Sequence, residues 1–324
     1  MTSANDAPLS VLRQLDSTLY SNITQDDLAF FRKAVAINRS HGKEEDVEDE
    51  TIKTHILDIQ SKAYAVHNYN CIRRFAFIRP KIAYLAGYHH ALELLKTREN
   101  PILADIGCCF GNDIRKAAMD GWPTQNLLAC DLRREFWDIG HALFKSTPET
   151  FPVKFIQGDI FNDAFFSPGS SAASNIAGID LTAIDSLTPL REKISAIHTS
   201  SLFHLFDEDQ QLALAKRLST LLLLEPGSII FGSHGGQLIK GIRERRPPRI
   251  DPAERYMFCH SPESWKKLWC ENVFSQEQGV KVRVEAELAQ VERKDLGFAR
   301  ANESEDKANE ENKFWAMKWF VQII

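Results

Sequence analysis

The sequence predicts an α/β fold built on a mostly parallel sheet, and three observations support this prediction. Short apolar runs alternate with amphipathic, helix-like segments from about residue 80 onward. The runs ILADI at 102–106 and LLACD at 127–131 end in, or are followed by, glycine and aspartate, as buried strands often are where they meet a ligand. The final segments, VRVEAEL at 282–288 and FWAMKWFVQII at 314–324, alternate apolar and polar residues, which predicts a terminal antiparallel pair.

The first part of the chain has a mixed pattern that predicts helices outside the main domain. We place this helical extension at residues 1–79 and the main domain at residues 80–324. The acidic run HGKEEDVEDE at 41–50 is typical of a solvated loop. From Pro80 onward, apolar residues at three- and four-residue spacing predict an amphipathic helix that ends before Pro101. Its apolar face is expected to hold Ile82, Leu85, Ala86, His89, Leu92 and Leu95.

The alternation of strands and helices then continues along the chain. We expect a strand at 102–106, a helix from 112, strands at 127–131, 153–157 and 194–200, helices at 134–144 and 207–224, and a strand at 228–233. The segment 235–256 is rich in basic residues and predicts a long loop. Ser261-Pro262-Glu263 predicts the start of a helix that runs through Trp269. The polar insert at 301–313 predicts a mobile hairpin loop.

The composition is that of a globular protein and argues against several classes. Hydrophobic residues make up 44% and charged residues 26% of the 324 positions, and the net charge of −5 gives no overall attraction for nucleic acid. The six cysteines lack paired metal-ligand spacing, so we expect reduced thiols and no metal site. The N-terminal segment resembles no signal peptide, and no apolar run reaches the ~18 residues that span a bilayer. These features predict a cytoplasmic monomer or homodimer that does not enter the membrane.

A glycine-rich turn follows the first predicted strand, in the stretch LADIGCCFGND at 103–113. Gly107 and Gly111 allow the backbone to approach a nucleoside, and Asp131 lies twenty residues after Gly111, where a carboxylate can bind ribose hydroxyls. The third glycine of a pyrophosphate-binding turn is missing. Asn112 and Asp113 follow instead, and an acid at that position suits a cationic ligand without phosphate. The sequence therefore predicts a ribose-bearing cofactor other than a dinucleotide.

At these residues the sequence resembles the class I methyltransferases that use S-adenosylmethionine. The resemblance covers roughly residues 80–324 and implies a Rossmann-like, seven-stranded, mostly parallel sheet with a terminal antiparallel hairpin. Asp105, Gly107 and Gly111 match the turn D/E-x-G-x-x-x-G that lies under the methionine part of the cofactor, and Cys108 lies within it. Three further matches are implied: Asp131, followed by Leu132, for the ribose, Asp159 for the adenine amino group, and Ile160 for the adenine face.

A narrower resemblance is to fungal methyltransferases of secondary metabolism, including carboxyl methylators of meroterpenoid pathways. It rests on ADIGCCFGNDIRKAAMDGWP, on the segment DLRREFWDIGHALF and on SSLFHLFDEDQQ. In that group the segment matching YNCIRRFAFIRP at 69–80 is thought to lie over the cofactor. The resemblance implies an O-methyltransferase that acts on a small-molecule acceptor, with a carboxylate favoured over a hydroxyl.

Several alternatives remain open at the level of sequence. His198 and His204 follow the fourth predicted strand, where acceptor-facing residues come from, so each is a candidate catalytic residue or a satisfied core histidine. The basic run at 243–249 is a solvated loop or a receptor for an acidic substrate. A non-methylating relative, such as a pericyclase or a binding protein, would keep the same cofactor motifs. A methyltransferase of nucleic acid or protein is disfavoured by the lack of an Asn/Asp-Pro-Pro-aromatic motif, and a nicotinamide oxidoreductase by the missing glycine.

Overall fold

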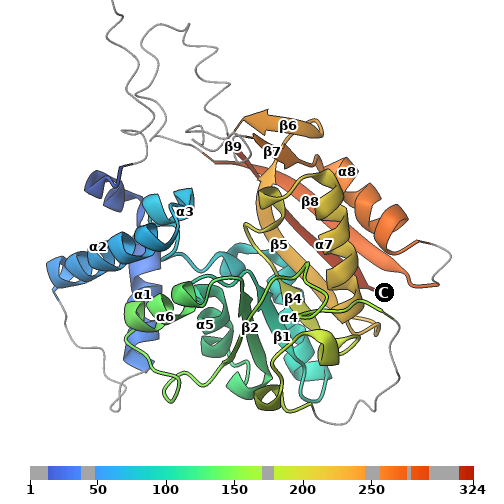
Figure 1. Ribbon diagram of the computed structural model, residues 1–324, viewed down its shortest axis with the longest axis horizontal. Helices are drawn as coiled ribbons and strands as arrows, with labels where there is room; N and C mark the ends of the chain where they lie inside the picture. Colours follow the sequence, from blue (N-terminus) through green and yellow to red (C-terminus); the bar gives the residue numbers. More distant parts are fainter. Residues whose placement is uncertain (1–13, 38–47, 170–178, 245–255, 276–278, 292–313) are drawn as a thin grey trace, which may run out of the picture.

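The computed structural model describes residues 14–37, 48–169, 179–244, 256–275, 279–291 and 314–324. Its centre is a seven-stranded sheet in the order β3-β2-β1-β4-β5-β9-β8 (Figure 1). The strands are β1 (Leu103–Ile106), β2 (Leu127–Asp131), β3 (Lys154–Gln157), β4 (Ala196–His198), β5 (Ile229–Gly236), β8 (Val282–Val291) and β9 (Phe314–Ile323). The first five are parallel, and β9 pairs antiparallel with both β5 and β8. This arrangement confirms the predicted Rossmann-like fold with its terminal antiparallel hairpin.

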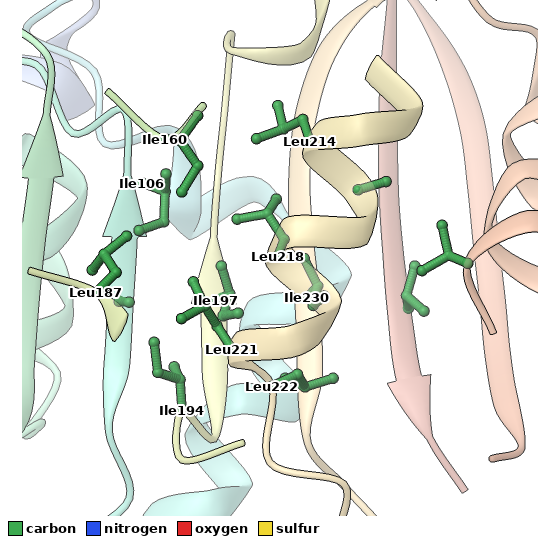
Figure 2. Packing of buried hydrophobic residues seen from close by; sticks show 14 of the residues in the cluster. Ile106, Ile160, Leu187, Ile194, Ile197, Leu214, Leu218, Leu221, Leu222 and Ile230 are labelled. Carbon is green, nitrogen blue, oxygen red and sulfur yellow. The ribbon is translucent and has the colours of Figure 1, made fainter. Parts of the chain in front are cut away.

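Helices cover both faces of the sheet, as the apolar character of its strands requires. On one face, α7 (Glu208–Leu221) packs Leu214, Leu218 and Leu221 against Ile197 of β4 and Ile230 of β5 (Figure 2). The helix α8 (Pro262–Lys267) and the π-helical turn η9 (Leu268–Val273) extend this layer over β8. On the other face, α4 (Ala86–Thr97) and α5 (Asn112–Met119) pack against the central strands.

The N-terminal helices form a third apolar cluster beside the sheet layers. They are η2 (Ser17–Asn22), α1 (Gln25–Ile37), α2 (Asp49–Val66) and α3 (Asn70–Arg73). Their buried side chains pack against α6 (Arg134–Leu143), notably Phe136 and Leu143, and against Phe110 of the glycine-rich turn. Figure 1 shows these helices at the end of the molecule where α5 and α6 lie. Because Phe110 belongs to this cluster, the position of the turn depends on N-terminal packing.

Most predicted elements lie within a few residues of their predicted positions, and three predictions need correction. The predicted helix from Pro80 is divided into the turn η3 (Lys81–Tyr84) and α4, because Leu85 between them has an extended backbone. The buried face of α4 consists of Gly87, Tyr88, Ala91 and Leu94, displaced from the predicted face, and His89 is exposed.

The predicted loop at 235–256 holds for residues 237–240 and is wrong in its other described parts, where Gly235 and Gly236 belong to β5. Residues 241–244 form β6 (Gly241–Glu244), which pairs antiparallel with β7 (Tyr256–Cys259). Residues 245–255 and the predicted hairpin loop at 301–313 lie outside the described residues. Within the described residues, no helix is both long enough and apolar enough to cross a membrane. The division into residues 1–79 and 80–324 stays a prediction.

Candidate functional site

A cavity of about 650 Å³ opens at the carboxyl ends of β1, β2 and β4. This size is within the range of small-molecule sites, ~300–1,000 Å³, and the position is the one expected for a parallel α/β sheet. Its walls come from the glycine-rich turn, the ends of four strands, the N-terminal helices and the β6–β7 hairpin. Of the predicted site residues, the cavity is lined by Asp105, Gly107, Cys108, Asp131, Leu132, Asp159, Ile160, His198 and His204.

The glycine-rich turn is tied to β2 through its backbone. The amides of Gly107 and Cys108 both donate to the carbonyl oxygen of Cys130, at 2.8 and 3.1 Å. Gly107 has φ +81°, a conformation that glycine adopts without steric cost. Burial raises the pKa of the Cys108 and Cys109 thiols well above the ordinary value, so both remain neutral. These neutral thiols are not activated nucleophiles.

Gly111 does not line the cavity, although the motif places it in the cofactor site. It has φ +70° at the N-terminus of α5, and a Cβ atom there would lie 2.5 Å from the Trp137 ring and 2.8 Å from Nη1 of Arg115. The glycine is therefore required by close packing behind the turn. Its direct contact with a cofactor stays a prediction.

Arg115 supports the turn from behind through hydrogen bonds to two backbone carbonyl groups and one hydroxyl. Its guanidinium donates to the carbonyl oxygens of Phe110 and Gly111, at 2.9 and 3.1 Å, and to Oγ of Ser146. The group also lies over the ring of Phe151, 4.3 Å from its centroid. Burial lowers the pKa of Arg115 to about 9. Because a buried guanidinium is costly, its hydrogen bonds to the turn must offset that cost.

Asp131 ends β2 and faces the cavity. Its Oδ2 accepts from the amide of Cys109 at 2.9 Å, and its Oδ1 accepts from the amide of Arg133 at 3.0 Å. Burial raises the pKa of this carboxyl, and the two amide hydrogen bonds oppose that shift. A carboxylate oxygen can accept more than one hydrogen bond, so Asp131 retains capacity for two neighbouring hydroxyl donors.

Asp159 and Ile160 line the same cavity after β3. Oδ1 of Asp159 accepts from the amide of Phe161 at 2.9 Å, which fixes the exposed carboxylate over the loop. Ile160 is buried and adds an apolar surface beside it. An acid next to an apolar face suits a flat heterocycle with an amino group at its edge, and the adenine role of these two residues stays a prediction.

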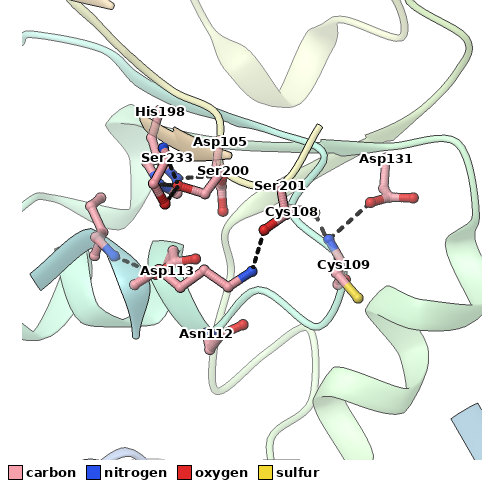
Figure 3. A network of polar contacts seen from close by, with 12 residues as sticks. Asp105, Cys108, Cys109, Asn112, Asp113, Asp131, His198, Ser200, Ser201 and Ser233 are labelled. Atoms are coloured by element: carbon pink, nitrogen blue, oxygen red, sulfur yellow. Dashed lines mark hydrogen bonds and ion pairs between the residues drawn. The ribbon is translucent and has the colours of Figure 1, made fainter. Parts of the chain in front are cut away.

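A buried chain of hydrogen bonds joins β1, β4 and β5 at the floor of the cavity (Figure 3). Nδ1 of His198 lies 2.8 Å from Oδ1 of Asp105, and Nε2 of His198 lies 2.8 Å from Oγ of Ser200. The Ser200 oxygen also accepts from the amide of Ser233 at 3.1 Å. His198 is 1% exposed and Asp105 is 2% exposed. Both imidazole nitrogens are therefore engaged inside the protein.

Charged groups surround His198 on two further elements. Asp113 of α5 is buried and accepts from the amide of Ile82 at 2.8 Å, and Lys81 donates to Oγ of Ser201 at 3.0 Å. Burial alone would lower the pKa of His198, but the charge and hydrogen bond of Asp105 and the charge of Asp113 outweigh it, so the pKa is raised. Burial raises the pKa of Asp113, and the charges of His198 and Lys81 oppose this.

Asp105, Asp113 and His198 also place one potential ligand atom each within 4.8 Å of one another, a spacing that could hold a metal ion. However, Asp105 and His198 share a hydrogen bond through Oδ1 and Nδ1, and Asp113 Oδ1 holds the Ile82 amide. A metal would have to displace these contacts. We interpret the three side chains, together with Lys81, as an internal charge cluster.

The opposite end of the cavity is lined by Arg243 of β6, Met257 of β7 and Phe314 of β9. The guanidinium of Arg243 lies 5.0 Å from the centroid of the Phe314 ring. His204 also lines the cavity, and its Nδ1 accepts from the amide of Gly235 at 3.4 Å. This end therefore combines a cation with apolar surface. The other basic residues of the run at 243–249 lie outside the described residues.

The N-terminal extension contributes directly to the cavity wall, through Tyr69, Cys71, Arg73 and Phe77 among others. The position over the cofactor that the resemblance implies for 69–80 stays a prediction. Tyr69 meets the His67 ring edge to face, with ring centroids 4.1 Å apart, and Arg73 donates to the carbonyl oxygen of Gln14. The N-terminal helices therefore form part of the cavity wall.

Sequence reasoning missed Lys81, Ser200, Met257 and Phe314 as cavity residues. Ser200 could have been found, because it follows β4 at the edge where the other site residues end. The remaining three come from a turn, a hairpin and a terminal strand whose packing has no local sequence signal.

Comparison with known proteins identifies similar chains. A family profile described as "Meroterpenoid methyltransferase N-terminal domain" matches residues 16–78. O-methyltransferase phiE from Fungal sp. (strain ATCC 74256) is 34% identical over 223 residues, which cover 69% of this chain and 66% of phiE. Methyltransferase adrK from Penicillium rubens is 30% identical over 236 residues, covering 73% of this chain and 74% of adrK. Methyltransferase ausD from Penicillium brasilianum is 27% identical over 255 residues, covering 78% of this chain and 79% of ausD.

The solved structures that this chain matches include the 1,6-didemethyltoxoflavin-N1-methyltransferase of Burkholderia thailandensis, with bound 1,6-didemethyltoxoflavin and S-adenosylhomocysteine. The sequence identity is 12% and the TM-score is 0.44, and the alignment covers 86% of this chain and 93% of that protein.

Proposed function

Because this chain belongs to the fungal secondary-metabolism methyltransferases, we propose that it transfers the methyl group of S-adenosylmethionine to a carboxylate oxygen of a small, largely apolar acid. The observation that carries the carboxylate assignment is that neither cavity histidine offers a free lone pair as a base, while Arg243 supplies a cation. The cofactor and the acid would occupy opposite ends of one cavity.

The residues at the first end fit the cofactor in charge and hydrogen-bonding character. Asp105 Oδ2 is buried with no hydrogen-bond partner, and an orphaned carboxylate oxygen is stabilised by a cationic group such as an ammonium. Asp131 presents acceptors for two ribose hydroxyls, and Asp159 with Ile160 presents an acid and an apolar face for adenine. When bound, S-adenosylmethionine supplies a methyl group activated by a sulfonium.

At the second end the chain has to orient an acid and exclude water. Arg243 can hold one carboxylate oxygen through a charge-assisted hydrogen bond, and Met257 and Phe314 offer apolar surface to the rest of the molecule. In the transfer, the other carboxylate oxygen forms a bond to the methyl carbon as the carbon–sulfur bond breaks and its electron pair passes to sulfur. The products are a methyl ester and S-adenosylhomocysteine, and no proton is moved.

A hydroxyl acceptor would need a base, and the two candidate histidines are poorly placed for this role. His198 is buried, and both its nitrogens are engaged by Asp105 and Ser200. Nδ1 of His204 accepts from a backbone amide, which can only donate, so in the neutral ring the proton is on Nε2. A carboxylic acid has a pKa near ~4 and is already ionised at neutral pH, so it needs positioning and no base.

The test is a methylation assay with an isotopically labelled methyl donor and a panel of apolar carboxylic acids, each matched by the corresponding alcohol or phenol. We expect label only with the acids, in a product that releases labelled methanol in mild base, as a methyl ester does. Label in base-stable ethers would favour hydroxyl methylation. No transfer to any acceptor, despite binding of S-adenosylhomocysteine, would favour a non-methylating relative.

A further inference from the structure

The hydroxyl of Ser200 has an unusual set of neighbours. Its oxygen lies 2.8 Å from Nε2 of His198 and 3.1 Å from the amide nitrogen of Ser233, and the Ser233 hydroxyl is 3.4 Å away. Ser200 is 8% exposed and lines the cavity. The direction in which its single proton points therefore depends on these neighbours.

Counting protons and lone pairs shows that the charge of His198 sets this direction. The Ser233 amide always donates to the Ser200 oxygen. A charged imidazolium donates from both nitrogens, to Asp105 and to Ser200, so the two lone pairs of the Ser200 oxygen are filled. Its proton is then available to the Ser233 hydroxyl, 3.4 Å away, or to a stronger acceptor in the cavity. A neutral His198 that keeps its proton on Nδ1, beside Asp105, would instead accept the Ser200 proton at Nε2. The cavity would then lose a donor.

The surroundings favour the charged form. The groups facing His198 are Asp105 on β1, Asp113 on α5 and Lys81 on η3, with Ser200 and Ser233 as neutral partners. Although burial and Lys81 disfavour the imidazolium, the two carboxylates prevail and the pKa is raised. The imidazolium is therefore present below pH ~6.5 and is lost only as the pH rises through the raised value.

The same cluster offers one buried acceptor. Oδ2 of Asp105 has no hydrogen-bond partner. On the other side of the His198 ring, the Ser200 hydroxyl has a proton to donate. Lys81, which donates to the Ser201 hydroxyl, adds a positive charge. The amino-acid end of a ligand carries an ammonium, which complements the Asp105 oxygen, and a carboxylate, which complements the Ser200 hydroxyl and the Lys81 charge. We infer that Ser200 donates a hydrogen bond to the α-carboxylate of the cofactor, and that His198 is the positioning residue that holds Ser200 in this role. This inference rests on the proposed function, which places that cofactor in the cavity.

The experiment uses calorimetry of the full chain with two ligands. S-adenosylhomocysteine carries the carboxylate, and S-adenosyl-3-thiopropylamine keeps the amine but lacks it. Ser200→Ala should weaken the binding of S-adenosylhomocysteine about tenfold or more, because the lost hydrogen bond goes to a charged group. It should change the affinity for the amine by less than about twofold. Ser233→Ala is the matched control, since it retains the backbone amide, and should leave both dissociation constants within about twofold of the parent.

A second measurement needs no variant. The pKa of His198 is obtained from its NMR titration, and the ratio of the two dissociation constants is followed across that pKa. We expect the preference for S-adenosylhomocysteine to fall as the pH rises through the pKa, and to be independent of pH in Ser200→Ala.

Three results would overturn the inference. The first is an equal loss of affinity for both ligands in Ser200→Ala, and the second is no loss of affinity for either. The third is a ratio of the two dissociation constants that stays constant while His198 titrates. Failure of the parent chain to bind either ligand would instead refute the proposed function, so the two failures are distinguishable.

Discussion

Replacing Gly111 by alanine tests whether this glycine serves packing or cofactor contact. Gly111 has φ +70°, where a side chain costs roughly 1–2 kcal/mol. The new Cβ would also lie 2.5 Å from the Trp137 ring and 2.8 Å from the Arg115 guanidinium. Overpacking of this kind costs ~1–3 kcal/mol. The two contributions together predict that Gly111→Ala lowers the free energy of unfolding by about 2–5 kcal/mol.

Gly121→Ala is the matched control for this measurement. Gly121 has φ +103°, and a Cβ atom there would meet nothing within 4 Å, so the variant isolates the backbone cost. Urea unfolding of the three proteins gives the comparison, with calorimetry of S-adenosylhomocysteine on the folded variants. We expect Gly111→Ala to be less stable than Gly121→Ala, with cofactor affinity largely retained. Equal stability of the two variants, together with a large loss of affinity in Gly111→Ala, would refute the packing argument and favour direct contact.

The remaining predictions concern the cavity and the polar insert. Asp131→Ala should weaken the binding of S-adenosylhomocysteine by ~1–3 kcal/mol without unfolding the chain, because two ribose hydroxyls lose their acceptor. An unchanged dissociation constant would show that Asp131 does not bind the cofactor. His198→Asn and His204→Asn should each lower turnover by less than ~10²-fold, and the rate of the parent enzyme should be flat from about pH 6 to 8. A larger fall in either variant, with a parent rate that rises through a pKa near ~6.5, would support a histidine base and a hydroxyl acceptor. Arg243→Gln should raise the KM of acid acceptors more than it lowers kcat, and Arg243→Lys should restore part of the loss; an equal KM in both variants and the parent would exclude this cation from acceptor binding. Shortening the insert at 301–313 should leave activity nearly intact, and loss of folding would show that the insert packs against the domain.

The sequence by itself determined the sheet and which strand-end residues come together in the cavity. Strand and helix periodicity is local, and the motif residues lie at strand ends, which the parallel topology brings to one edge. Asp105, Gly107, Asp131 and Asp159 could therefore be assigned to one site without coordinates. Their order along the chain is also their order across the sheet edge, since β1, β2 and β3 are neighbours.

Tertiary structure alone decided how the remaining groups are used. Gly111 satisfies the motif, yet it lies behind the turn because Trp137 of α6 and Arg115 of α5 occupy the space beside it. The segment at 235–256 has loop-like composition, but β6 and β7 pair across it because each strand supplies the backbone partners that the other lacks. His198 suits catalysis by residue type, whereas its contacts with Asp105 on β1 and Ser200 turn its lone pairs inward. These outcomes depend on contacts between residues far apart in the chain, and no local pattern encodes them.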